Sequence, residues 1–405
     1  MILRKKDFKL KHEVNIPSSK SISNRLLVLK YLLKKKLNFD LKIYNLATSD
    51  DTKILHKVLS SSFHCSIVNV KNAGTAYRFL TSLFSIISGE VILGGSDEMK
   101  KRPIKELVEP LKKLGAEIIY LEKAGFPPLR IEGNILKGGK IKVNTQISSQ
   151  YVTSLLLVAP FLEKGIELEQ IGEIKSKSYT DMTISLLKEI GVEVEQKDNI
   201  ILVKPIESIS KNRIIVEADW SSASYWYELI SLLPEYSKIQ IKGLQKDSIQ
   251  GDSVISELFK RFGIKTFFGE NGVEIIKTKQ VSDLYFEYDF SSIPDMVPTF
   301  VATCVGLGFN GKFTGISHLV YKETNRIEAL KNEIEKLNYS LEMIDNDSFE
   351  IKKTGELPDN VKINTYKDHR IAMSFAPLVT VINEIEIENE DVVVKSYPEF
   401  WGEFC

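Results

Sequence analysis

One local pattern occurs four times along this chain: an amphipathic helix, a turn at Gly or Asn, and a short β-rich run. The turns lie at Gly115, Gly191, Gly263 and Asn338, about 75 residues apart, which is longer than the period of solenoid repeats. Each repeat is therefore predicted to be a βαβ-type unit rather than a hairpin. Glycine at these turns can adopt the left-handed conformation that ends a helix, and asparagine is its usual substitute. The pattern predicts an α/β chain built by duplication, with helices and sheets in layers.

Composition limits the possible partners and the compartment. The 405 residues are 43% hydrophobic, enough for the cores of two or three domains, and the 54 basic and 54 acidic side chains cancel. No global field attracts nucleic acid or a membrane, so an anion site must be built locally. The three cysteines, Cys65, Cys304 and Cys405, form no CxxC motif and cannot all pair, which favours a reducing cytoplasm. We expect no signal peptide, membrane span, metal or other cofactor.

The stretch 317–330 combines charges with a predicted helix start. Lys322, Glu323 and Arg326 precede apolar residues at helical spacing, so they are predicted to lie at a helix N-terminus. Backbone N–H groups at such an end favour phosphate or carboxylate, and Glu323 offers a carboxyl group for proton transfer. The alternative is a capped surface helix with ordinary charged side chains.

Other predicted helix starts repeat this theme, although capping or solvated cations could explain each of them alone. Their candidate binding residues are Lys20, Ser21, Arg25, Asn72, Gly74, Arg78, Arg102, Ser148, Ser149, Gln150, Ser176, Tyr179, His369 and Arg370. Gly74 would let the backbone approach a ligand closely, and Pro103 suits the first position of a helix.

Two residues of the last third allow two interpretations each. Asp295 is either a helix N-cap or a carboxylate that accepts a proton. Lys395 ends a run of valines that is predicted to be a strand, where a lysine would normally face solvent. Taken together, the helix starts carry many cations but only two obvious carboxylates, Asp295 and Glu323. We infer a small, polyanionic substrate pair and acid–base chemistry.

Six motifs follow one another along nearly the whole chain: SKSISNR at 19–25, NAGTA at 72–76, KRPI at 101–104, SSQ at 148–150, KETNR at 322–326 and DHRIAM at 368–373. In this order they resemble the 5-enolpyruvylshikimate-3-phosphate synthase family. That family transfers the enolpyruvyl group of phosphoenolpyruvate to the 5-hydroxyl of shikimate 3-phosphate and releases phosphate, in the shikimate pathway to aromatic amino acids.

The resemblance implies an inverse α/β barrel-like fold of two domains, each made of three βαβαββ units. Domain 1 would comprise residues 1–18 and 219–405, and domain 2 residues 19–218, with the active site in the cleft between them. We expect a cytoplasmic monomer that acts on small molecules and binds neither nucleic acid nor membrane.

The resemblance also implies roles for individual residues. Those expected to hold shikimate 3-phosphate are Ser21, Arg25, Ser148, Ser149, Ser176, Asp295 and Lys322. Those expected to hold phosphoenolpyruvate are Lys20, Gly74, Arg102, Gln150, Arg326, Arg370 and Lys395. Glu323 would carry the carbon proton and Asp295 the hydroxyl proton, with Lys20 as a catalytic partner, and Asn72, Arg78, Tyr179 and His369 would support the site.

Five positions depart from the family pattern: Ser18, Phe79, Glu98, His318 and Asn325. None of them removes a proposed catalytic group, but Phe79 and Glu98 bear on substrate affinity and on sensitivity to the inhibitor glyphosate.

Two other functions are compatible with parts of the sequence. A related transferase acts on UDP-N-acetylglucosamine with a reactive cysteine after its second repeat, but no cysteine here lies between Cys65 and Cys304. An RNA-binding protein could use basic runs such as 34–36, but the neutral charge and the absence of an RNP-like aromatic motif disfavour it.

Overall fold

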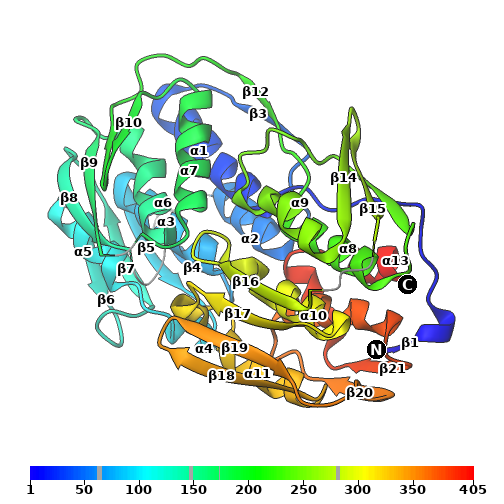
Figure 1. Cartoon of the computed structure of the whole chain (residues 1–405). Helices are drawn as coiled ribbons and strands as arrows, with labels where there is room; N and C mark the ends of the chain where they lie inside the picture. The colour runs from blue at the N-terminus through cyan, green and yellow to red at the C-terminus, as the bar shows by residue number, and fades with distance from the viewer. Residues whose placement is uncertain (62–65, 146–148, 173, 280–282) are drawn as a thin grey trace. The chain divides into compact units, whose positions relative to one another are not determined.

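The computed structural model describes residues 1–61, 66–145, 149–172, 174–279 and 283–405. The chain forms two compact units (Figure 1). Unit 1 comprises Met1–Ser19 and Glu217–Cys405, and unit 2 comprises Lys20–Val216. None of the helices in the described ranges is long and apolar enough to cross a membrane.

Unit 2 contains two complete βαβαββ repeats. The first is β4 (Ser66–Asn69), α3 (Gly74–Ile86), β5 (Gly89–Gly94), α5 (Lys105–Lys113), β6 (Glu117–Tyr120) and β7 (Leu129–Gly133), with the short α4 (Asp97–Lys100) before α5. The second is β8 (Gly139–Asn144), α6 (Ser149–Val158), β9 (Ile166–Ile171), α7 (Lys177–Glu189), β10 (Val194–Lys197) and β11 (Ile200–Val203). Unit 2 also contains α1 (Lys20–Leu37), α2 (Asp50–Leu59), and the parallel pair β3 (Lys42–Tyr44) and β12 (Arg213–Ile215).

Unit 1 repeats the same plan. One repeat is β2 (Glu13–Val14), α8 (Trp220–Leu232), β13 (Lys238–Lys242), α9 (Ile255–Leu258), β14 (Ile264–Gly269) and β15 (Gly272–Lys277). The next is β16 (Tyr285–Asp289), α10 (Val297–Leu307), β17 (Asn310–Thr314), α11 (Arg326–Glu335), β18 (Tyr339–Asp345) and β19 (Ser348–Lys353). A third sheet joins β1 (Ile2–Arg4), β20 (Asn360–Ile363) and β21 (Glu384–Ile387), with α12 (His369–Phe375) between the last two and α13 (Phe400–Phe404) at the end.

The four larger sheets share one topology. In each, the first two strands of the repeat are parallel and the last two add antiparallel, as in the order β4-β5-β7-β6. The sheets β8-β9-β11-β10, β2-β13-β15-β14 and β16-β17-β19-β18 follow the same order. The predicted βαβαββ repeat is therefore confirmed.

The predicted helix-ending turns are also confirmed. Gly115, Gly191 and Gly263 have φ angles of 103°, 105° and 79°, and Asn338 has a φ of 56°. Each follows a helix and precedes a strand of its repeat, where a left-handed residue lets the chain reverse direction.

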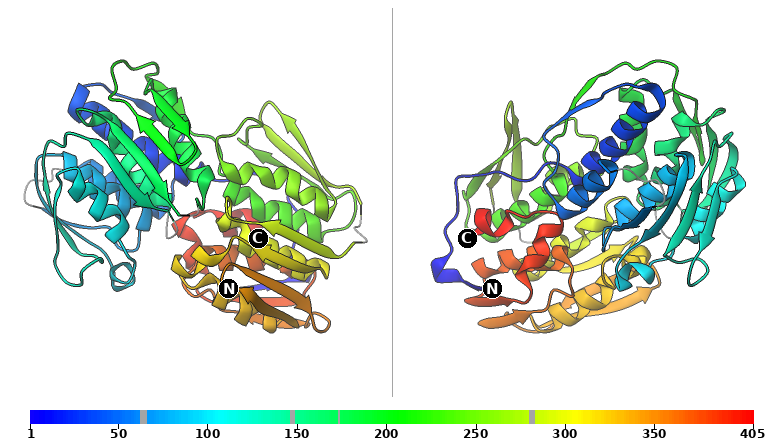
Figure 2. Two further views of the ribbon diagram at one scale, coloured as in Figure 1. Left: turned by 60° about the vertical axis from the view of Figure 1, so that its left-hand side comes forward. Right: turned by 180° about the vertical axis from the view of Figure 1, so that it is seen from behind.

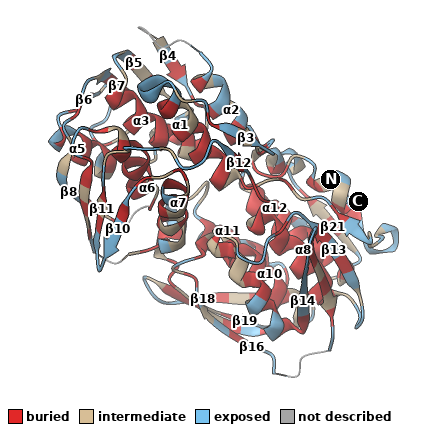
Figure 3. Cartoon of the chain, turned by 90° about the horizontal axis from the view of Figure 1, so that it is seen from above, coloured by how far each residue is buried: buried red, intermediate tan, exposed pale blue. Residues whose placement is uncertain are grey.

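In both units the helices that open the repeats form the core. Every residue of α6 is buried apart from Gln150, and α3, α8 and α10 are nearly as enclosed, as the red ribbons of Figure 3 show. Such helices are apolar on all sides because they are surrounded by protein. The sheets that cover them alternate buried and exposed residues, as in β7 and β13, and Figure 2 shows them from two further sides. This arrangement matches the predicted inverse α/β plan.

Candidate active site

Charged side chains from separate segments of unit 1 gather in one group, here called the unit 1 cluster. Its members are Asp295, Lys322, Glu323, Arg326, Asp368, Arg370 and Lys395. They come from the 3-10 helix η5 (Pro294–Met296), the segment before α11, the first turns of α11 and α12 with the N-cap of α12, and the end of the 3-10 helix η8 (Glu390–Lys395). All members except Asp368 are residues to which the sequence motifs assign a role.

Arg326 is the centre of this cluster. Its Nε donates to Asp368 Oδ2 at 2.8 Å, Nη1 to Asp295 Oδ1 at 3.0 Å, and Nη2 to Glu323 Oε2 at 3.0 Å. Its side chain is only 1% exposed, yet these carboxylates outweigh the effect of burial and raise the pKa of Arg326. His369 lies next to Asp368, with its Nδ1 3.7 Å from Asp368 Oδ1. Arg326 thus holds the two candidate proton carriers in fixed positions.

Asp295 faces three cations. Its Oδ1 lies 3.1 Å from Lys322 Nζ as well as 3.0 Å from Arg326, and its Oδ2 accepts from Arg370 Nη2 at 2.9 Å. Burial alone would raise the pKa of Asp295, but the three cations hold it well below its ordinary value. The N-cap interpretation is wrong because α10 begins at Val297, two residues later, and the carboxylate points at the cations instead.

Glu323 bridges Arg326 and a lysine from the end of the chain. Its Oε1 lies 2.9 Å from Lys395 Nζ, and both side chains are 15% exposed. The predicted strand before Lys395 is wrong: residues 390–395 form the 3-10 helix η8. Its valines resemble a strand by composition, but Asn389 has a φ of 50° and starts a tight helical turn, which aims Lys395 at Glu323.

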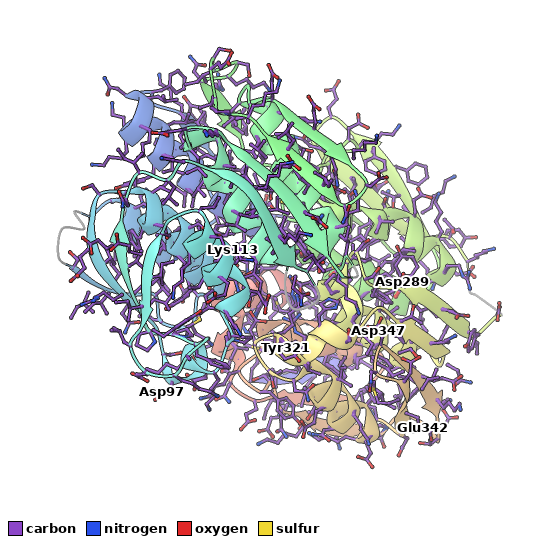
Figure 4. All side chains as sticks on the ribbon, turned by 90° about the vertical axis from the view of Figure 1, so that its left-hand side faces the viewer. Asp97, Lys113, Asp289, Tyr321, Glu342 and Asp347 are labelled. Atoms are coloured by element: carbon purple, nitrogen blue, oxygen red, sulfur yellow. The ribbon has the colours of Figure 1, made fainter. Side chains whose placement is uncertain are left out.

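The segment before α11 is fixed at both ends. The Ser317 N–H of the 3-10 helix η6 (Ser317–Tyr321) donates to Asp347 Oδ1 at 2.7 Å. Figure 4 labels Asp347 and Tyr321, whose side chain is half exposed. At the other end, the Asn325 side chain accepts a backbone N–H from the first turn of α11. Because Asn and Asp cap helices equally well, the departure at Asn325 preserves this start.

The candidate residues of unit 2 also converge at helix starts. The unit 2 cluster consists of Lys20, Ser21, Arg25, Gly74, Arg78, Arg102, Ser149, Gln150, Ser176 and Tyr179, from the starts of α1, α3, α6 and α7 and the segment before α5. Hydrogen bonds of Arg25 to Tyr179 and Thr183 link the N-terminal parts of α1 and α7, and the hydrogen bond of Arg78 to Gln150 links those of α3 and α6. Ser148 lies outside the described residues.

In the described part of the chain, the hydrogen bonds of the buried Arg25 go to uncharged oxygens. It donates to Thr183 Oγ1 at 2.8 Å and to the carbonyls of Ser21 and Tyr179 at 2.7 and 3.0 Å. Its guanidinium also lies 5.8 Å from the ring centre of Phe79, one of the departures from the family pattern. Burial lowers the pKa of Arg25 to about 10. A desolvated cation whose described partners are uncharged oxygens is well suited to an anionic ligand.

A second part of the unit 2 cluster surrounds Gly74. Arg78 Nη1 donates to Gln150 Oε1 at 2.9 Å, and Gln150 Nε2 donates to Thr75 Oγ1 at 3.3 Å. A Cβ on Gly74 would lie 2.7 Å from Arg102 Nη1 and 2.8 Å from Arg78 Nη1. Arg102 Nη2 is buried and has no hydrogen-bond partner among the described residues. Two guanidinium groups therefore lie against a bare backbone at a helix start.

The other predicted residues of unit 2 are placed as follows. Lys20 Nζ lies 3.5 Å from Asp51 Oδ2, an acidic partner that the sequence analysis did not identify. Ser176 precedes α7 with a φ of 56°, and its side chain does not cap the helix. Asn72 Oδ1 is buried with no partner in the described ranges. Pro103 is not the first helical residue, because α5 begins at Lys105.

Gly74→Ala is expected to raise KM for an anionic substrate of this cluster by about tenfold or more. The new Cβ would overlap the ends of both guanidinium groups and force them out of their present positions, and a loss of about 1.4 kcal/mol in substrate binding corresponds to tenfold. Gly94→Ala is the matched control, since its Cβ would meet nothing closer than 3.9 Å. Steady-state kinetics of both variants measure the effect, and equal KM values would contradict this view of Gly74.

No group of three or more His, Cys, Asp or Glu residues that could hold a metal ion occurs in the described part of the chain. The chemistry available in the two clusters is anion binding and proton transfer by carboxylates and lysines.

Comparison with known proteins identifies the family of this chain. Residues 60–404 match the family model described as EPSP synthase (3-phosphoshikimate 1-carboxyvinyltransferase). A 3-phosphoshikimate 1-carboxyvinyltransferase of Bacteroides fragilis (strain YCH46) is 41% identical over 398 residues, 97% of this chain and 94% of that protein. One of Haemophilus influenzae (strain PittEE) is 34% identical over 96% of this chain and 95% of its own length.

Solved structures show the same fold. An EPSP synthase of Acinetobacter baumannii superposes with a TM-score of 0.73 at 19% identity, covering 97% of this chain and 94% of its own. The enolpyruvyl transferase NikO from Streptomyces tendae superposes with a TM-score of 0.73 at 12% identity, covering 100% of this chain and 96% of its own. From the family match and the relatives at 41% and 34% identity, the chain belongs to the EPSP synthase family, the 3-phosphoshikimate 1-carboxyvinyltransferases.

Proposed function

We propose that the unit 1 and unit 2 clusters act on one pair of substrates, shikimate 3-phosphate and phosphoenolpyruvate. The chain is an enzyme of the shikimate pathway that transfers the enolpyruvyl group of phosphoenolpyruvate to the 5-hydroxyl of shikimate 3-phosphate and releases phosphate. The assignment of residues is supported mainly by one observation: Asp295 and Glu323 lie in one cluster with the cations that pair with them.

The charges of the clusters suit these substrates. Each substrate carries a phosphate and a carboxylate, so four anionic groups must be brought together against their mutual repulsion. The unit 2 cluster contributes four cations, Lys20, Arg25, Arg78 and Arg102. Cations and oriented backbone N–H groups at helix starts can offset the repulsion because they are in place before the substrates bind.

The binding roles follow the family pattern position by position. The proposed ligands of shikimate 3-phosphate are Ser21, Arg25, Ser148, Ser149, Ser176, Asp295 and Lys322. The proposed ligands of phosphoenolpyruvate are Lys20, Gly74, Arg102, Gln150, Arg326, Arg370 and Lys395. For Arg326, the carboxylate contacts favour a further role, since most of its N–H groups already hold Asp295, Glu323 and Asp368.

Proton transfer is proposed to proceed through Glu323 and Asp295. In the addition step, the methylene carbon of phosphoenolpyruvate gains a proton from Glu323, and the 5-hydroxyl, as it bonds to the adjacent carbon, gives its proton to Asp295 or Lys20. In the elimination step, Glu323 removes a proton from the new methyl group and phosphate leaves. The anions of the substrates would draw Lys322 and Arg370 away from Asp295, which raises its pKa and makes it a better base.

The function is tested by phosphate release from phosphoenolpyruvate by the purified chain. Release is expected with shikimate 3-phosphate and not with UDP-N-acetylglucosamine, the acceptor of the related transferase. Release with the nucleotide sugar alone would assign the chain to that reaction, and release with neither acceptor would contradict the proposal.

The monomeric state and the cytoplasmic location are proposed as well. The buried Cys304 and the exposed Cys405 are both free thiols, which fits a reducing compartment. Size-exclusion chromatography with light scattering is expected to give a mass near 46.0 kDa, and a mass near twice that value would contradict a monomer.

A further inference from the structure

A buried carboxylate next to the unit 1 cluster is not used by the proposed reaction. Asp252, in the 3-10 helix η3 (Gly251–Val254), is 4% exposed and accepts a short hydrogen bond from Ser221 Oγ at the start of α8. Its other oxygen, Oδ1, is buried and has no hydrogen-bond partner among the residues that the structure describes. Burying an ionised carboxylate lowers the stability of the fold, which suggests that Asp252 is present for a functional reason.

The Ser221 hydroxyl connects Asp252 to Arg370. Arg370 Nη2 donates to Ser221 Oγ at 3.5 Å and to Asp295 Oδ2 at 2.9 Å, while Nη1 donates to the Tyr225 hydroxyl at 3.4 Å. Because the Ser221 O–H donates to Asp252, the serine oxygen can present its lone pairs to Arg370. The guanidinium of Arg370 is thus oriented by two hydroxyls and one carboxylate.

The loop that carries Asp252 is tied firmly to the same helix start. The Gln250 side chain accepts the Trp220 N–H at 3.1 Å and donates to the Ala218 carbonyl at 2.8 Å and to Glu217 Oε1 at 2.9 Å. Asp252 is therefore held in place by contacts other than the hydrogen bond to Ser221.

We propose that Asp252 is a positioning residue that orients Arg370 through Ser221, so that its ionisation controls the affinity for phosphoenolpyruvate. This rests on the proposed function, which assigns Arg370 to phosphoenolpyruvate. The negative charge of Asp252 polarises the Ser221 hydroxyl and strengthens its acceptor side, and this fixes the guanidinium plane. Protonated Asp252 would instead be able to donate to Ser221 and would weaken this hold.

Burial and the neighbouring charges place the ionisation of Asp252 within an accessible pH range. Burial raises the pKa of Asp252 to about 6; Ser221 and Arg370 act in the lowering direction, and Asp295 and Asp219 in the raising direction. Asp252 is thus mostly ionised at pH 8 and mostly protonated at pH 5. Because its pKa is raised on folding, ionised Asp252 lowers stability above pH 6, and removing its charge should not destabilise the protein there.

Asp252→Asn is expected to raise KM for phosphoenolpyruvate by about five- to tenfold at pH 8, with kcat within about twofold. The ratio of the KM values of variant and wild type should fall toward one as the pH drops from 8 to 5.5, because wild-type Asp252 then loses its charge too. Protonation of the substrate phosphate, whose second pKa is about 6, affects both proteins equally and cancels in the ratio. A ratio that is independent of pH would overturn the proposal.

A double-mutant cycle shows whether Asp252 acts through Ser221. In a Ser221→Ala background, Asp252→Asn should raise KM for phosphoenolpyruvate by less than about twofold. If the effects of the two substitutions on KM were fully additive, Asp252 would not act through Ser221. Asp247→Asn, an exposed aspartate in the preceding loop, is the matched control and should leave KM unchanged. If Asp252→Asn also lowered the thermal midpoint of unfolding at pH 8 in parallel with its kinetic defect, the residue would have a structural role only, and the proposal would be overturned.

Arg370→Gln separates this proposal from the proposed function. If Arg370→Gln leaves KM for phosphoenolpyruvate unchanged, the assignment of the substrate site is wrong. If Arg370→Gln raises KM strongly but Asp252→Asn does not, the site assignment stands and the role of Asp252 is refuted.

Discussion

Replacement of Glu323 by glutamine is expected to lower kcat by about a hundredfold or more, because general acid–base groups typically contribute about 10²–10⁴-fold. Glutamine has nearly the same shape, so contacts with Arg326 and Lys395 can persist, but the amide cannot carry the proton of the substrate carbon. KM should change much less than kcat, as for an interaction needed mainly in the transition state. Steady-state phosphate release measures both constants.

The control for this variant is Glu328→Gln on the exposed face of α11. It makes the same chemical change at an exposed residue that takes no part in the proposed proton transfer, and it should retain wild-type turnover. Both variants should show the circular dichroism spectrum of the wild type. Wild-type kcat in Glu323→Gln would refute the role of this carboxylate.

Replacement of Arg326 by methionine is expected to abolish measurable turnover and to lower the free energy of unfolding by about 3–5 kcal/mol. Arg326 is 1% exposed and neutralises Asp368, which is fully buried, together with Glu323 and Asp295. Without the guanidinium, these carboxylates would repel one another in a site with little water. Urea denaturation at pH 7.5 measures the loss.

Arg4→Met is the matched control because it breaks the exposed ion pair between Arg4 and Glu384. Pairs of that kind contribute less than about 1 kcal/mol. If the two substitutions cost the same unfolding free energy, Arg326 would not be the centre of a buried charge network.

The repeat and the helix starts were accessible from sequence because they depend on local rules. Helix-ending glycines such as Gly191 and N-terminal residues such as Arg326 and Gly74 are determined by backbone conformation and by capping, which act over a few residues. The family match has since confirmed the resemblance that these motifs suggested.

Pairings between distant residues were not accessible in the same way. Asp368 opens the DHRIAM motif, but only the fold shows that it accepts a hydrogen bond from Arg326, 42 residues earlier in the chain. Asp252 has no motif of its own and becomes noticeable only when its burial and its contact with Ser221 are known. The valines before Lys395 favoured a strand by composition, and tertiary packing produced a 3-10 helix instead.

Hydrogen exchange with and without both substrates tests the central proposal most directly, namely that the two clusters bind one substrate pair. With shikimate 3-phosphate and phosphoenolpyruvate present, amides at the starts of α3 and α6 in unit 2 and of α11 and α12 in unit 1 should all become protected. Protection of helix starts in one unit alone, at saturating concentrations of both substrates, would contradict the proposal.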